Sequence, residues 1–179
     1  MSADLRPDQI SACDAFLLGK IDRIEFCKNF GFASQEIPAE VGRLLSIATQ
    51  SRDKETVAYA LLLGFWFGFP ENVAARIHDL IGQEWHQGHE DMISLLQDFK
   101  DPDSIPYLQT AIELKPALEY LEYDDYGAYY KKCLWALAAI GTRHALAVIE
   151  DCTKADDKVL AKEARYRLKR IADTQSEHR

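Results

Sequence analysis

The sequence of 179 residues lacks the short motifs that mark common catalytic sites. It has no GxSxG nucleophile elbow, no glycine-rich phosphate loop, no dinucleotide-binding fingerprint and no HExxH zinc motif. The alternation of apolar and polar residues that is typical of β-strands is essentially absent as well. We therefore expect an all-α protein that is not an enzyme, with no catalytic residue, no metal ion and no cofactor.

Basic residues and long apolar runs are also scarce. The chain carries 21 Lys and Arg against 29 Asp and Glu, a net charge of −8, whereas nucleic-acid binders normally show a basic surface. The longest uncharged run, residues 56–70, is shorter than the ~20 residues that a membrane-spanning helix needs. Asp4 and Asp8 stand where a secretory signal would be basic and then apolar. We expect a cytoplasmic protein that binds neither nucleic acid nor membrane.

Cysteine is present but without the spacing of a metal site. The four residues, Cys13, Cys27, Cys133 and Cys152, form no CxxC pair and fall among apolar helical positions. Reduced core cysteines explain this distribution better than disulfides or metal ligands do.

What the chain has instead is helical periodicity from end to end. Residues 101–108 read as a helix start, with an acidic cap followed by prolines in the first turn. Apolar stripes with helical spacing then predict four hairpins, at about 40–69, 71–99, 103–141 and 143–172. Residues 1–38 are expected to form an N-terminal helical cap, in which 8–29 make one long helix or two short ones. Residues 173–179 are expected to be a disordered tail, so that 1–179 is a single domain with its hairpins in 39–172.

Two stretches resemble a known repeat. They are Asp101-Pro102-x-x-Ile105-Pro106-x-Leu108 and Trp135-Ala136-Leu137-Ala138-Ala139-Ile140-Gly141, which look like a HEAT repeat, and residues 159–168 look like the second helix of another. The resemblance covers 101–172, while the hairpins of 40–100 lack the signature residues. It implies an α-solenoid, a HEAT-like stack of about four helical hairpins that serves as a scaffold for binding other proteins.

Residues 116–127 are an insert where a HEAT hairpin would have a short turn. Acids and tyrosines crowd there, and no basic residue lies between Lys115 and Lys131. This combination suits a cationic surface, because carboxylates accept arginine and tyrosines add rigid apolar area. In the alternative interpretation, the tyrosines anchor the loop and the acids stay solvated. The predicted binding residues in this region are Glu119, Tyr120, Glu122, Tyr123, Asp124, Asp125, Tyr126 and Tyr130.

A second polar segment, residues 85–91, could continue that surface. Trp85, His89, Glu90 and Asp91 are predicted to contribute to it. His86 and His89 have a spacing at which two side chains can share a helical face and hold a metal ion. Because Gly88 between them indicates a turn, an ordinary polar loop between helices is the simpler interpretation.

The resemblance extends to small, acidic, stand-alone HEAT-like proteins of bacteria that serve as immunity proteins. It implies a protein partner, specifically a basic toxin domain of nuclease type, which the chain binds and neutralises. The alternative is a HEAT-like lyase or other enzyme, or a carrier of a small molecule or chromophore. Association steered by acids would slow as salt rises, which distinguishes the first reading from an apolar interface.

Overall fold

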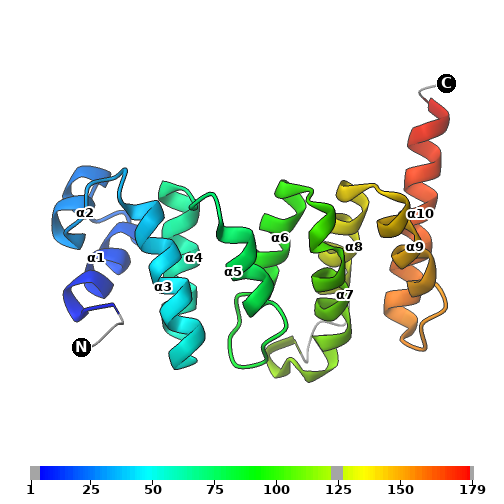
Figure 1. Ribbon diagram of the computed structural model, residues 1–179, viewed down its shortest axis with the longest axis horizontal. Coiled ribbons are helices and arrows are strands. Elements are labelled where there is room, and N and C mark those ends of the chain that lie inside the picture. Colours follow the sequence, from blue (N-terminus) through cyan, green and yellow to red (C-terminus); the bar gives the residue numbers. More distant parts are fainter. Residues whose placement is uncertain (1–4, 122–126, 178–179) are drawn as a thin grey trace. The chain divides into compact units, whose positions relative to one another are not determined.

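A computed structural model describes residues 5–121 and 127–177 (Figure 1). Within these ranges the chain forms α-helices and short 3-10 turns and contains no strand, so the predicted all-α class is confirmed. The chain divides into two compact units. The first comprises the residues up to Leu80 together with Trp85–Gly88, and the second comprises Ile81–Glu84 and the chain from His89 onward. No helix in the described ranges is both long and apolar enough to cross a membrane.

The first unit holds helices α1 (Pro7–Leu17), α2 (Arg23–Phe30), α3 (Ile37–Ser51), α4 (Lys54–Phe67) and α5 (Val73–Leu80). The N-terminal region is thus two short helices. Gly19, just after α1, has a φ of +66°. The Asp22 carboxylate caps α2 by accepting hydrogen bonds from the N–H groups of Ile24 and Glu25, each at 2.9 Å.

A cluster of aromatic rings joins α1 and α2 to α4. Phe26 and Phe30 are fully buried and stack with their centroids 5.1 Å apart. Phe16 meets the edge of Trp66 at 4.6 Å, and Phe26 stacks on Phe67 at 5.0 Å. Such ring pairs stabilise a core beyond their area burial. The N-terminal helices therefore share one core with the first hairpin, α3–α4.

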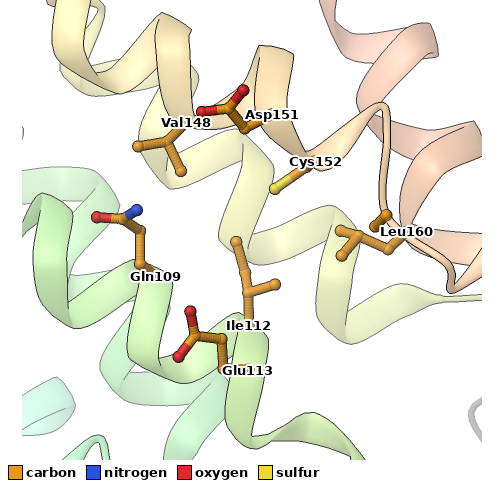
Figure 2. Close-up of a pocket in the computed structure, with 8 residues that line it drawn as sticks. Gln109, Ile112, Glu113, Val148, Asp151, Cys152 and Leu160 are labelled. Carbon is orange, nitrogen blue, oxygen red and sulfur yellow. The ribbon is translucent and has the colours of Figure 1, made fainter.

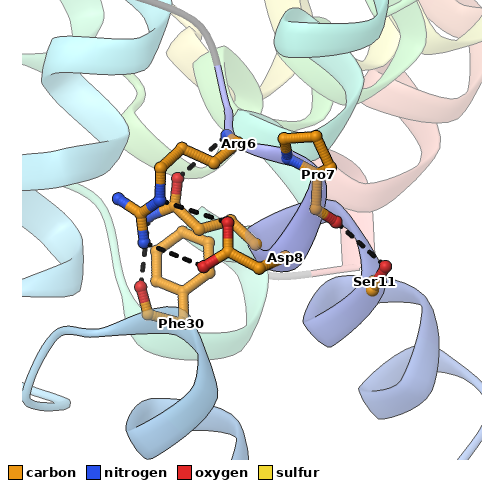
Figure 3. A network of polar contacts seen from close by, with 6 residues as sticks. Arg6, Pro7, Asp8, Ser11 and Phe30 are labelled. Atoms are coloured by element: carbon orange, nitrogen blue, oxygen red, sulfur yellow. Dashed lines mark hydrogen bonds and ion pairs between the residues drawn. The ribbon is translucent and has the colours of Figure 1, made fainter.

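Polar contacts fasten the start of α1 to the end of α2 (Figure 3). The Arg6 N–H donates to the Gln9 side chain at 3.1 Å, and the Gln9 amide donates to the Phe30 carbonyl at 3.1 Å. The Arg6 guanidinium pairs with Asp8 and lowers the pKa of that carboxyl. Since Gln9 is only 2% exposed, these bonds satisfy a buried polar side chain.

Helix α4 is less completely buried than its apolar sequence predicts, because Phe65 is 50% exposed. Its Gly64 is required by close packing. A Cβ at that position would fall on the ring of Phe69, which folds back over the helix after Gly68. Phe69 in turn meets the edge of the Phe65 ring at 5.3 Å.

The second unit holds α6 (His89–Phe99), α7 (Ile105–Leu114), α8 (Ala128–Ile140), α9 (Arg143–Cys152) and α10 (Lys158–Glu177). Three 3-10 turns complete it: η1 (Pro102–Ser104), η2 (Lys115–Ala117) and η3 (Glu119–Leu121). Helix α8 packs against α6, α7, α9 and α10. Its inward face includes Cys133, which is fully buried, and burial raises the pKa of that thiol. Helices α7 and α8 lie within residues 103–141, and α9 lies within residues 143–172, where α10 also begins.

The end of the chain departs from prediction. Helix α10 continues to Glu177, so residues 173–177, predicted to be disordered, are helical. No glycine or proline interrupts residues 158–177, and the Thr174 hydroxyl donates to the Arg170 carbonyl at 3.0 Å within this last stretch.

Candidate protein-binding site

The structure describes the two ends of the acidic and aromatic insert. Five of the predicted binding residues, Glu122, Tyr123, Asp124, Asp125 and Tyr126, lie outside the described residues. The turns η2 and η3 precede them, and Gly127 with helix α8 follows them. The site is therefore built from these two ends and from the start of α6.

The first end of the insert is held by His89. The Tyr120 hydroxyl lies 2.9 Å from His89 Nδ1, and the two rings stack with centroids 5.9 Å apart. On its other side, His89 Nε2 lies 2.9 Å from the Gln83 carbonyl oxygen. Because a carbonyl only accepts, Nε2 carries a proton, and in the neutral ring Nδ1 accepts from the Tyr120 hydroxyl. These bonds fix the position of η3 against the first turn of α6.

The second end is held by two tyrosines of α8. Tyr129 is fully buried, and its hydroxyl donates to the Ala111 carbonyl at 3.2 Å. Tyr130 is 2% exposed, and its hydroxyl donates to Asp157 at 2.8 Å. Burial alone would raise the pKa of Asp157, but the bond from Tyr130 and two backbone N–H bonds outweigh it and the pKa is lowered. The carboxylate is thus held in its charged, accepting form.

Gly127 stands directly before α8 in a backbone conformation that favours glycine. Its φ of +67° lies in the left-handed region, and a Cβ there would contact Cγ1 of Val159. Glycine alone meets both demands without strain.

Three acidic residues adjoin the Tyr120–His89 contact along the chain, since Glu90 and Asp91 follow His89 and Glu119 precedes Tyr120, and we call these three the acidic surface. Asp91 and Glu119 are exposed, and Glu90 is half-exposed, with its carboxylate 3.6 Å from the Lys132 ammonium. Burial raises the pKa of the Tyr120 hydroxyl, and the negative charges of Glu90 and Asp91 raise it further. Tyr120 therefore stays neutral at physiological pH in a negative local field.

Comparison of the chain with models of protein families, with curated proteins and with solved structures gives no match. The functional argument therefore rests on the side chains of the chain itself.

The predicted binding residues fall into separate structural roles. His89 and Tyr130 are buried, so they can serve a binding site only by holding the insert in place. Asp91 and Glu119 are exposed and available for direct contact. Trp85 belongs to the first unit, where its ring meets the edge of the His86 ring at 4.9 Å. Among the predicted residues that the structure describes, Tyr120 and His89 are in direct contact, and Glu90 and Asp91 follow His89 in the first turn of α6.

His86 is part of the packing of its loop. Its Nε2 lies 2.9 Å from the Leu80 carbonyl, and its Nδ1 accepts from the Gly88 N–H at 3.2 Å. Burial lowers the pKa of this ring and favours the neutral form. In the described ranges, no group of three or more His, Cys, Asp or Glu side chains is placed to hold a metal ion.

Two features of the second unit were not predicted from the sequence. One is a pocket between α7 and α9, lined by Gln109, Ile112, Glu113, Val148, Asp151, Cys152, Ala155 and Leu160 (Figure 2). The other is the Arg167 guanidinium, 4.8 Å from the ring of Trp135 and ion-paired with Glu163 at 3.3 Å. The i,i+4 spacing of Glu163 and Arg167 could have predicted their ion pair. The apolar stripes of α7 and α9 could not have predicted the pocket, because they do not show that a space is left between the two helices.

Proposed function

We propose that the protein is a HEAT-like scaffold that binds a basic protein partner through the acidic surface. The observation that supports it is the setting of Glu90, Asp91 and Glu119 around a segment fixed by the Tyr120–His89 hydrogen bond. Carboxylates accept arginine side chains with two parallel hydrogen bonds, and a segment that is already ordered loses little entropy on binding.

The charge of the whole chain supports the same class of partner. A net charge of −8 attracts a cationic protein over a distance and raises the rate of encounter. In its specific form, the proposal is that the chain is a bacterial immunity protein, which covers the cationic active site of a cognate nuclease-type toxin and excludes the substrate. The step from a HEAT-like fold to this role is an analogy between folds.

The test is a pull-down from the source cells with the tagged protein and two charge-reversal variants. Asp91→Lys/Glu119→Lys reverses the acidic surface, and Asp98→Lys/Glu150→Lys reverses two exposed acids of the same unit as the matched control. We expect a stoichiometric basic protein with the wild type and the control, and a loss of at least about tenfold with the surface variant, because several charged contacts change sign.

Equal recovery by both variants would contradict the assignment of the acidic surface. Recovery of a bound small molecule in place of a protein would favour the enzyme or ligand-carrier alternative. For the immunity role, co-expression with the recovered partner should protect cells from it, and the surface variant should not.

A further inference from the structure

The pocket between α7 and α9 shares no lining residue with the acidic surface. Its volume is about 230 Å³. Three of its side chains are apolar and nearly buried: Ile112 is 6% exposed, and Val148 and Leu160 are each 7% exposed. They give the pocket an apolar floor against which an aliphatic chain can pack.

Carboxylates line the same pocket from both helices. Glu113 comes from α7 and Asp151 from α9, and both residues are exposed. The lining belongs wholly to the described part of the chain and includes no lysine or arginine. An apolar floor beside negative groups is complementary to a side chain with an aliphatic stem and a cationic end.

The thiol of Cys152 lies inside this environment, and Figure 2 shows its sulfur facing Ile112. Burial raises the pKa of the thiol, and the negative charge of Asp151 raises it further. Cys152 therefore senses both its apolar surroundings and the negative charge of Asp151.

We propose that this pocket binds a lysine side chain of a partner protein. Its stem packs on Ile112, Val148 and Leu160, and the negative charges of Glu113 and Asp151 at the sides of the pocket stabilise its ammonium group. The volume is below the roughly 300–1,000 Å³ of typical small-molecule sites, which suits one inserted side chain better than a larger organic ligand. The two carboxylates oppose an anionic occupant.

Asp151 already accepts an ammonium group from its own chain. Lys154 Nζ lies 2.9 Å from the Asp151 carboxylate, and the two side chains are 75% and 78% exposed. An ion pair so exposed to solvent contributes little to stability, so an incoming lysine that also packs on the apolar floor can replace Lys154.

Thiol–disulfide exchange at Cys152 tests the chemistry of the pocket without any partner. The experiment uses the full chain with Cys27→Ala, which removes the other partly exposed thiol. Cys13 and Cys133 can stay, because both are fully buried. At equilibrium with cystamine or with bis(2-hydroxyethyl) disulfide, the Cys152 thiolate attacks one sulfur, the S–S bond breaks, and the small thiolate leaves and takes up a proton. The adduct from cystamine ends in an ammonium group, and the adduct from bis(2-hydroxyethyl) disulfide ends in a hydroxyl group.

We expect intact-mass spectrometry to show about threefold more of the ammonium adduct, the size of a favourable exposed ion pair. Glu113→Gln and Asp151→Asn should each reduce this preference, and Glu150→Gln, an exposed acid of α9 outside the pocket, should leave it unchanged. Equal amounts of the two adducts would overturn the proposal. A preference for the ammonium adduct that persists in both Glu113→Gln and Asp151→Asn would also overturn the proposal, because it would then come from the net charge of the whole chain.

A protection experiment separates a lysine side chain from a free amine. Nα-acetyl-lysine amide should slow the reaction of Cys152 with iodoacetamide, whereas Nα-acetyl-norleucine amide, which lacks the ammonium group, should not. If cadaverine protects and the capped lysine does not, the pocket takes a free diamine and docking of a protein side chain is excluded. Protection by neither compound also overturns the proposal.

Discussion

The Tyr120 hydroxyl joins the described start of the insert to α6. It donates a hydrogen bond to His89 Nδ1 at 2.9 Å, and His89 is fully buried. A buried nitrogen that loses its donor keeps its desolvation cost without the compensating bond. The insert is therefore connected to the core through a residue whose removal has a measurable penalty.

Tyr120→Phe should lower the free energy of unfolding by about 1–2 kcal/mol, since the ring still packs while the hydrogen bond is lost. Urea denaturation measures the change. Tyr166→Phe is the control, because Tyr166 is 51% exposed and its substitution should change stability by less than about 0.5 kcal/mol. If the two variants lose the same stability, the Tyr120–His89 bond contributes nothing.

His86 gives the fold a dependence on pH. In the unfolded chain an imidazole takes up its proton near pH 6.5, about its reference value, but burial lowers the pKa of folded His86. Between these two pKa values the unfolded state binds more protons, so stability is complete above the unfolded pKa and is lost as pH falls below it.

His86→Gln should flatten the fall in Tm between pH 8 and pH 5, because the variant has no imidazole to protonate at this site. Its amide keeps a donor for the Leu80 carbonyl. His144→Asn, a change on the exposed surface of α9, is the control and should keep the slope of the wild type. An unchanged slope in His86→Gln would show that other groups cause the pH dependence.

At the scale of the elements, Gly127 sets the backbone conformation at the start of α8. Its positive φ and the contact with Val159 are separate constraints. Gly141, the cap after α8, shares the φ of +67°, but its Cβ would have nothing nearer than the Ala138 carbonyl at 3.5 Å. The chain thus contains its own comparison between left-handed strain alone and strain combined with a side-chain contact.

Gly141→Ala should cost about 1–2 kcal/mol, the penalty of the left-handed conformation for an alanine. Gly127→Ala should cost more, and the double variant Gly127→Ala/Val159→Ala should recover the excess, as a double-mutant cycle in chemical denaturation would show. Equal losses at the two glycines, with no coupling to Val159, would rule out the contact.

The elements themselves follow largely from local sequence. The acidic residue and proline at 101–102 place the start of η1, where the Asp101 side chain accepts from the Asp103 N–H at 3.0 Å, and Gly141 ends α8 with a positive φ. The continuation of α10 to Glu177 was missed because a polar run without an apolar stripe gives little signal in either direction.

The site depends on tertiary contacts that no local pattern contains. The sequence predicts that acids and tyrosines gather in the insert, but Tyr120 meets His89 across 31 positions of chain, and Tyr130 meets Asp157 across 27. Residue type alone could not separate the partly exposed Tyr120 from the fully buried Tyr129. The pocket between α7 and α9 could not be predicted either. Helical spacing places Ile112 and Val148 on the apolar faces of their helices, but it does not show that space remains between them.

At the scale of the whole molecule, the charge of −8 predicts how binding responds to salt. The association rate with the basic protein recovered in the pull-down should fall steadily as NaCl rises from 0.05 to 0.5 M, because the Debye length shortens from above about 10 Å to below it. The dissociation rate, set by short-range contacts, should change much less. Surface plasmon resonance separates the two rates.

Asp91→Asn/Glu119→Asn should make the dependence of the association rate on salt shallower, whereas Asp98→Asn/Glu150→Asn should act only through the shared loss of net charge. An association rate that does not respond to salt would mean that the interface is apolar, and the acidic surface would then have no part in bringing the partner in.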